Sequence, residues 1–182
     1  MMWRKKQHQD HFFIKAKKMN YRSRSAFKLL EIFDKFKLIQ SHHNVIDLGA
    51  APGGFLQVIK QYTKGIVFGV DLQVIQPITG VSLYKTDVRD FNTNMHFHGV
   101  ISDMAPNISG IKAVDQENIL MLNNLAYQFA CKHQCNWFVC KSFNHPQLFK
   151  WLETLPQQFS LYKPAATVKS SSEIYCIATK FL

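Results

Sequence analysis

The stretch DLGAAPGGF, residues 47–55, decides the fold of this chain. It places three glycines and one proline directly behind the apolar residues Val45 and Ile46. Glycines that follow a strand let the backbone approach a ligand closely, and proline suits the first turn of a helix. The stretch therefore predicts a strand at 44–48, a ligand-binding loop, and a helix at 52–63 that begins at Pro52.

Short apolar runs alternate with longer helical patterns in the rest of the chain. This alternation predicts an α/β fold with a mostly parallel sheet covered by helices on both faces. The last two strands are joined by a short link, so one strand is expected to be antiparallel. The seven predicted strands are 44–48, 65–71, 81–87, 99–104, 136–143, 159–164 and 172–179; the further helices are 115–132 and 145–155.

The positive charge is concentrated at the start of the chain. Of a net charge of +10 over 182 residues, the first forty residues carry +8. An amphipathic helix is predicted within 22–39, preceded by a shorter basic helix or arm at 10–18. We expect a basic helical extension over 1–40 and one structural unit over 41–182. The concentrated charge favours a nucleic acid partner, with candidate phosphate contacts at Lys15, Lys17, Lys18, Arg22 and Arg24.

Other features exclude several classes of protein. No apolar run reaches the roughly 18–20 residues of a membrane span, so we expect a soluble monomer without a membrane partner. The basic, acid-poor start lacks a secretory apolar stretch, which favours the cytoplasm, with mitochondria as the alternative. We expect no metal, because the four cysteines lack a CxxC spacing; they are predicted to be reduced and buried. The histidines at 42–43, 96 and 98 are predicted at the surface.

The glycine loop does not match the usual phosphate-binding motifs. Gly54 is followed by Phe55 rather than by GK[ST], and the glycine spacing does not fit GxGxxG, which disfavours an NAD-dependent enzyme. Asp71 closes the second strand and suits two ribose hydroxyls, while Asp87, after the third strand, can accept from an adenine amino group. Asp47 disfavours a diphosphate. The ligand expected is an adenosine that carries little negative charge, and S-adenosylmethionine fits.

Three charged side chains are expected near the same edge of the sheet, and a lysine of the helix predicted within 22–39 is unusual in its apolar setting. Asp103 follows the fourth strand, and Lys141 lies within the apolar run WFVCKSF. Glu173 opens the last strand, and Lys28 lies among apolar residues of the first amphipathic helix. Burial of an ammonium group without a partner is costly. These residues either form a reactive cluster or, as the alternative for Lys141, extend to solvent.

Six motifs together resemble the FtsJ family of S-adenosylmethionine-dependent ribose 2′-O-methyltransferases over nearly the whole chain. The resemblance implies a Rossmann-like methyltransferase fold and a catalytic Lys-Asp-Lys-Glu tetrad at Lys28, Asp103, Lys141 and Glu173. It implies cofactor contacts at Gly53, Phe55, Asp71, Asp87 and Asp103, to which we add Gly49 and Gly54 of the loop. The motifs are YRSRSAFKLLEI (21–32), DLGAAPGGF (47–55), GVDL (69–72), SDMAPNISG (102–110), CKSF (140–143) and SSEIY (171–175).

The resemblance implies methylation of a ribose, expected to be a uridine, in large-subunit ribosomal RNA or the assembling subunit. The alternatives are tRNA, an mRNA cap, or a non-catalytic RNA-binding factor of ribosome assembly. Lys141 would either accept the hydroxyl proton when neutral or orient the hydroxyl when charged. Two departures are Phe55, where the family often has tryptophan, and the serines at 171–172 before Glu173, where bacterial relatives usually have arginine.

Overall fold

A seven-stranded sheet forms the centre of the computed structural model, which describes residues 10–107 and 109–181. The strand order is β3-β2-β1-β4-β5-β7-β6. All neighbouring pairs are parallel except those of β7, which is antiparallel to both β5 and β6. This confirms the predicted fold class with one antiparallel strand. The strands are β1 (Val45–Leu48), β2 (Val67–Asp71), β3 (Ser82–Lys85), β4 (Gly99–Ser102), β5 (Trp137–Phe143), β6 (Ser160–Tyr162) and β7 (Glu173–Ala178).

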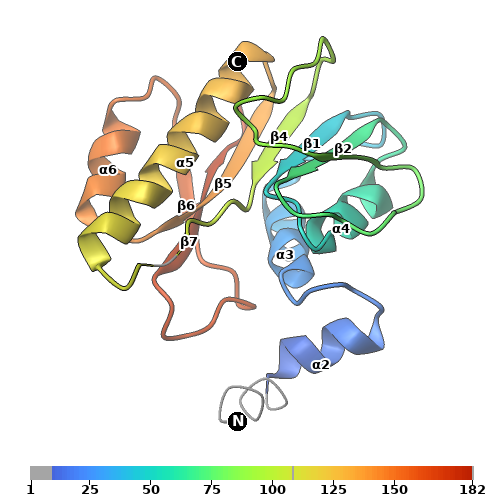
Figure 1. The fold of residues 1–182 in the computed structure, drawn as a ribbon, viewed down its shortest axis with the longest axis horizontal. Coiled ribbons are helices and arrows are strands. Elements are labelled where there is room, and N and C mark those ends of the chain that lie inside the picture. Colours follow the sequence, from blue (N-terminus) through green and yellow to red (C-terminus); the bar gives the residue numbers. More distant parts are fainter. Residues whose placement is uncertain (1–9, 108, 182) are drawn as a thin grey trace.

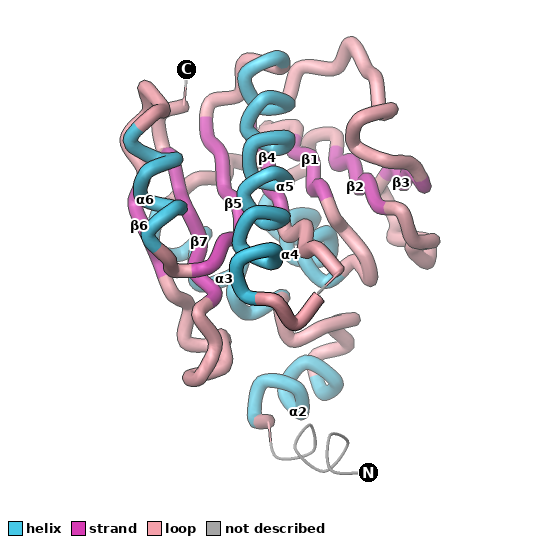
Figure 2. Tube along the Cα trace, turned by 60° about the vertical axis from the view of Figure 1, so that its left-hand side comes forward, coloured by secondary structure: helices cyan, strands magenta, loops and turns pink. Residues whose placement is uncertain are grey.

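Helices cover both faces of the sheet (Figures 1 and 2). Helices α3 (Ala26–Phe36) and α4 (Gly54–Tyr62) pack on one face, and α5 (Lys112–Lys132) and α6 (Pro146–Glu153) pack on the other. Side chains alternate along each strand, so Val45 enters the first core and Ile46 enters the second. Burial on both faces explains why the central strands are almost entirely apolar.

Helix α2 (His11–Lys18) lies apart from the sheet and packs against α3. The Asp10 carboxylate caps its first turn by accepting from the backbone N–H groups of Phe12 and Phe13. Within α2 only Ala16 is buried. By contrast, α3 contributes five buried apolar side chains to the main core. Helix α3 thus packs as part of the main core, and α2 contacts α3. The division of the chain at residue 40 stays a prediction.

Three local features differ from the sequence predictions. Helix α4 begins at Gly54 rather than at Pro52, because Gly53 has a left-handed φ of +106° and cannot continue a helix. Strand β3 ends at Lys85, so Asp87 lies in the following turn. His43 is buried rather than at the surface, and its ring stacks on that of His98 with 4.7 Å between centroids. Burial lowers the pKa of His43 to about 4.

Gly99 is the position in the sheet where a side chain is least tolerable. A Cβ added there would lie 2.0 Å from the buried ring of Trp137 on the neighbouring strand. We expect Gly99→Ala to lower the free energy of unfolding by about 1–3 kcal/mol, because a packed core does not yield to an added methyl group. Urea titration would measure this loss.

The control is the double variant Gly99→Ala/Trp137→Phe. The smaller ring provides space for the methyl group, so the double variant should lose less free energy than the two single variants together. Additive losses would contradict the steric explanation.

Candidate active site

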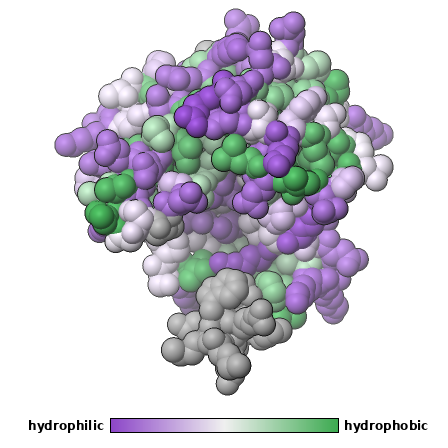
Figure 3. Space-filling model, in the orientation of Figure 1, coloured by the Kyte–Doolittle hydropathy of each residue, from purple (hydrophilic) through white to green (hydrophobic). Residues whose placement is uncertain are grey.

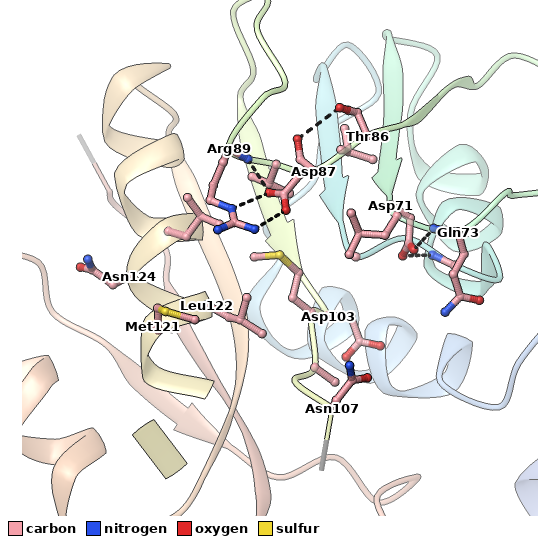
Figure 4. A pocket seen from close by; sticks show the side chains of 18 of the residues that line it. Asp71, Gln73, Thr86, Asp87, Arg89, Asp103, Asn107, Met121, Leu122 and Asn124 are labelled. Carbon is pink, nitrogen blue, oxygen red and sulfur yellow. Dashed lines mark hydrogen bonds and ion pairs between the residues drawn. The ribbon is translucent and has the colours of Figure 1, made fainter. Parts of the chain in front are cut away.

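A cavity of about 510 Å³ opens at the carboxyl ends of strands β1 to β4. Strand order reverses between β1 and β4, which is where ligands bind in open parallel sheets. Figure 4 shows Asp71 and Asp87 on one side of the cavity and α5 on the other. Polar and apolar residues line the cavity on both sides. It includes Gly49, Ala51, Asp71, Leu72, Gln73, Asp87, Arg89, Asp103, Met104, Asn107, Met121 and Leu122.

Asp71 is held in place by backbone donors on two segments. Its Oδ2 accepts from the Ala51 N–H at 2.8 Å, and its Oδ1 accepts from the Gln73 N–H at 2.8 Å. A carboxylate oxygen accepts more than one hydrogen bond, so both oxygens retain acceptor capacity on the cavity side. This arrangement suits a pair of vicinal hydroxyl groups.

Asp87 forms a two-point ion pair with Arg89 on the cavity wall. Arg89 donates from Nε at 3.0 Å and from Nη2 at 2.6 Å, and its backbone N–H donates at 2.9 Å. These bonds lower the pKa of Asp87 to about 2. The carboxylate is therefore ionised and oriented at neutral pH, as an acceptor for an amino group must be.

Asp47 is completely buried below the glycine loop, and neither of its carboxylate oxygens has a hydrogen-bond partner among the described residues. Burial raises the pKa of Asp47 well above its ordinary value, and the nearby carboxylates of Asp103 and Asp71 raise it further. An unpartnered buried carboxyl group is costly. A positively charged ligand group beside these three acids would lower that cost.

The glycines of the loop have two different functions in packing. Gly49 lines the cavity, and a Cβ there would lie 2.7 Å from the Met104 backbone. A Cβ on Gly53 would meet the Arg22 guanidinium at 3.0 Å, and one on Gly54 would meet the Ser23 hydroxyl at 2.1 Å. The double glycine therefore lets residues 22–23 lie directly on the loop, a constraint that the sequence did not reveal.

Phe55 lies in the core and is not part of the cavity lining. Its ring is 2% exposed and faces Tyr175, with 6.4 Å between centroids. Gly53 and Gly54 are likewise absent from the lining. Contacts of these three residues with a cofactor stay a prediction from the family resemblance.

An ion pair between Asp103 and Lys141 connects the cavity with the cluster of charged residues at the end of β5. Lys141 Nζ lies 2.9 Å from Asp103 Oδ1 and donates to the Asp103 carbonyl oxygen at 2.6 Å. The pair forms because β4 and β5 are parallel neighbours, with Ser102 opposite Cys140. The Tyr175 hydroxyl donates to the same Oδ1 at 3.1 Å. Asp103 also lines the cavity, so this one residue belongs both to the cavity and to the ion pair with Lys141.

The second ion pair joins Lys28 and Glu173, whose charged atoms are 2.5 Å apart. Thr167 also donates to this Glu173 oxygen, at 3.4 Å. The Lys28 ammonium lies 6.0 Å from the centre of the Tyr175 ring. The antiparallel direction of β7 brings Glu173 and Tyr175 to the rim of the sheet where β5 ends, beside Lys141. Four residues remote in sequence thus form two ion pairs near one tyrosine.

Tyr175 is the residue of this cluster that sequence reasoning missed. Its hydroxyl contacts Asp103, and its fully buried ring lies 6.0 Å from the Lys28 ammonium. Burial raises the pKa of Tyr175 above its ordinary value, so the phenol is a hydrogen-bond donor at neutral pH. A signal existed: Tyr175 lies two residues after Glu173 on the same strand, and such residues share one face of a sheet.

The five candidate phosphate contacts fall into two groups. Lys15, Lys17 and Lys18 are exposed on α2, and Figure 3 shows hydrophilic side chains among hydrophobic ones in the lower part of its coloured surface. The guanidinium of Arg22 instead donates to backbone carbonyl oxygens, and Arg24 forms an ion pair with Asp10. The two arginines thus have structural partners, while the lysines are accessible.

The state of Asp47 gives a testable effect on stability. Its pKa is raised in the folded chain from 3.8, so the free energy of unfolding should fall as pH rises above about 4 toward the folded value. Asp47→Asn removes this dependence. We expect the variant to gain stability relative to the parent chain as pH rises above about 4, measured by urea titration. The exposed Asp90→Asn is the control, and parallel pH curves for Asp47→Asn and the parent would refute the effect.

Comparison with known proteins identifies the family of this chain. The sequence model of the FtsJ-like methyltransferase family matches residues 21–181. The "Ribosomal RNA large subunit methyltransferase E" of Methanothrix thermoacetophila is 40% identical, over 95% of this chain and 73% of the relative. The protein of the same name from Coxiella burnetii is 42% identical, over 99% and 94%. A crystal structure from Plasmodium falciparum, named as a ribosomal RNA methyltransferase, superposes with a TM-score of 0.75 at 27% identity, covering 89% of this chain and 99% of its own. The chain belongs to the FtsJ-like methyltransferase family.

Proposed function

We propose that this protein transfers a methyl group from S-adenosylmethionine to a ribose 2′-hydroxyl of large-subunit ribosomal RNA. The observation that carries the proposal is the position of Asp103, which lines the cavity and also pairs with Lys141. A methyl donor in the cavity and an acceptor at the tetrad would then be adjacent. The names of the relatives supply the substrate class.

The described residues fit S-adenosylmethionine. Asp71 offers two oriented acceptors for the ribose hydroxyls, and Asp87 is an ionised acceptor for the adenine amino group. The Asp103 carboxylate, which lines the cavity, provides negative charge suited to a cationic ligand. A cavity of about 510 Å³ is within the usual range for a ligand of this size. When bound, the cofactor supplies an electrophilic methyl group.

Lys141 is the residue suited to hold the attacking hydroxyl. An ammonium group has three donors, and Lys141 uses two of them on Asp103 among the described residues. The third would be available for the ribose oxygen, where it would stabilise the negative charge that develops as the oxygen–methyl bond forms and the sulfur–methyl bond breaks. The hydroxyl proton would pass to solvent water. Asp103, fixed in turn by Tyr175, keeps the ammonium in position.

The Lys28–Glu173 pair completes the acceptor side. Both side chains are largely buried, with 9% and 16% exposed, so their mutual contact is weakly screened by solvent. Thr167 restrains Glu173 further. We assign this pair to the alignment of the ribose, because accurate placement of oxygen, methyl and sulfur in line lowers the barrier substantially.

Replacement of Lys141 should abolish the reaction. Removal of its amine in Lys141→Ala should reduce tritium transfer from S-adenosylmethionine to large-subunit ribosomal RNA by about 10²-fold or more. Cofactor affinity, measured by calorimetry, should change less than threefold. The exposed Lys150→Ala is the matched control.

The choice of RNA decides between the alternatives. Transfer should be assayed on free ribosomal RNA, isolated large subunits, tRNA and capped mRNA, with the methylated nucleoside identified; we propose a uridine. Tight RNA binding by the parent chain without transfer to any of them would favour a non-catalytic assembly factor. If kcat rises with pH in the parent chain but not in Lys141→Arg, Lys141 acts as a base instead.

The lysines of α2 should bind RNA without affecting the cofactor. The triple variant Lys15→Ala/Lys17→Ala/Lys18→Ala removes three exposed positive charges. RNA affinity should fall, and the slope of log K against log salt should become less steep by about 2–3. Affinity for S-adenosylmethionine should remain unchanged in calorimetry. An equal loss of both affinities would show that α2 is a structural part of the cofactor site.

A further inference from the structure

Arg22 connects two loops that border the cavity. Its Nη1 donates to the carbonyl oxygen of Pro52 at 3.2 Å and to that of Gln76 at 2.6 Å, and its Nη2 donates to that of Pro77 at 2.7 Å. Pro52 belongs to the glycine loop after β1, and the other two residues belong to the segment after β2. One guanidinium thus holds together two segments that are separate in sequence.

The segment after β2 depends on this contact. Leu72 and Gln73 line the cavity, and the segment has no regular secondary structure as far as Gly80. Among the described residues, 74–77 form no hydrogen bonds other than those to Arg22. Apolar packing of Ile75 and Ile78 on the core supports the segment as well. Arg22 is therefore its main polar attachment to the rest of the fold.

The backbone of Arg22 is itself fixed to helix α4. Its N–H donates to Gln57 Oε1 at 2.8 Å, and Gln57 Nε2 donates to the Asn20 carbonyl oxygen at 2.9 Å. The guanidinium lies against Gly53, where a Cβ would be only 3.0 Å from Nη1. Both ends of the arginine are thus positioned, which is not expected of a side chain whose role is to reach solvent phosphates.

We propose that Arg22 is a positioning residue for the cofactor cavity, and that it sets cofactor affinity by fixing the 72–78 segment against the glycine loop. This proposal rests on the proposed function only in taking S-adenosylmethionine as the ligand. It replaces the expectation from the sequence that Arg22 contacts RNA phosphate. It also assigns the N-terminal segment, beyond binding RNA, a part in holding the cofactor.

The proposal requires a guanidinium and not only a positive charge. Two nitrogens separated by the planar group reach three carbonyl oxygens at once, whereas the single nitrogen of lysine is a point donor. A lysine at position 22 would preserve attraction to phosphate but would leave carbonyl groups without partners. Arg22→Lys therefore separates the two roles.

The test compares Arg22→Lys and Arg22→Ala with Arg24→Ala. Arg24 lies two residues away and pairs with Asp10, without a contact to either cavity loop. We expect the dissociation constant for S-adenosylmethionine to rise about tenfold or more in both Arg22 variants and to stay within twofold in Arg24→Ala. The KM for the cofactor should rise in parallel, while kcat at saturating cofactor falls less than threefold. RNA affinity should be retained in Arg22→Lys.

Unchanged cofactor affinity in Arg22→Lys or in Arg22→Ala would overturn the proposal. If Arg22→Ala does not fold, Arg22→Lys and hydrogen exchange of the parent chain decide. Addition of cofactor should slow exchange in both 20–24 and 72–79, and slowing in 72–79 alone would overturn it. If the parent chain binds no S-adenosylmethionine, the proposed function fails first, which is a separate result.

Discussion

The contact between Asp103 and Lys141 is the interaction on which the site depends. It exists because β4 and β5 are parallel neighbours in register, which places the residue after β4 beside Lys141. Asp103 belongs to the cavity, and Lys141 belongs to the cluster at the antiparallel strand. A shift of register by one residue would turn Lys141 to the opposite face of the sheet and separate the two halves of the site.

Much of this arrangement could be predicted from the sequence. Short apolar runs and apolar stripes at helical spacing identified every strand and the main helices, because burial of a strand on both faces leaves a continuous apolar run. A lysine within an apolar run, such as Lys141, requires a partner. The sequence therefore also indicated the charged residues at the strand ends. The family motifs then assigned the tetrad, and the two ion pairs bring its members together.

What could not be predicted depends on contacts between distant segments. The cis bond before Pro52 and the late start of α4 follow from the path of the loop, which local patterns do not encode. Tyr175 appeared to be an ordinary apolar strand residue, because only the fold places its hydroxyl near Asp103. Arg22 appeared to be a basic surface residue, because its charge is evident in the sequence while its three carbonyl partners are not.

The close contact of residues 22–23 with Gly53 and Gly54 has an evolutionary consequence. Since the N-terminal segment occupies the space where side chains of the loop would lie, neither stretch is free to diverge by itself. A chimaera between two family members should be tolerated only when residues 22–23 and the glycine loop come from the same parent. The natural point of recombination therefore lies before residue 20, on the α2 side.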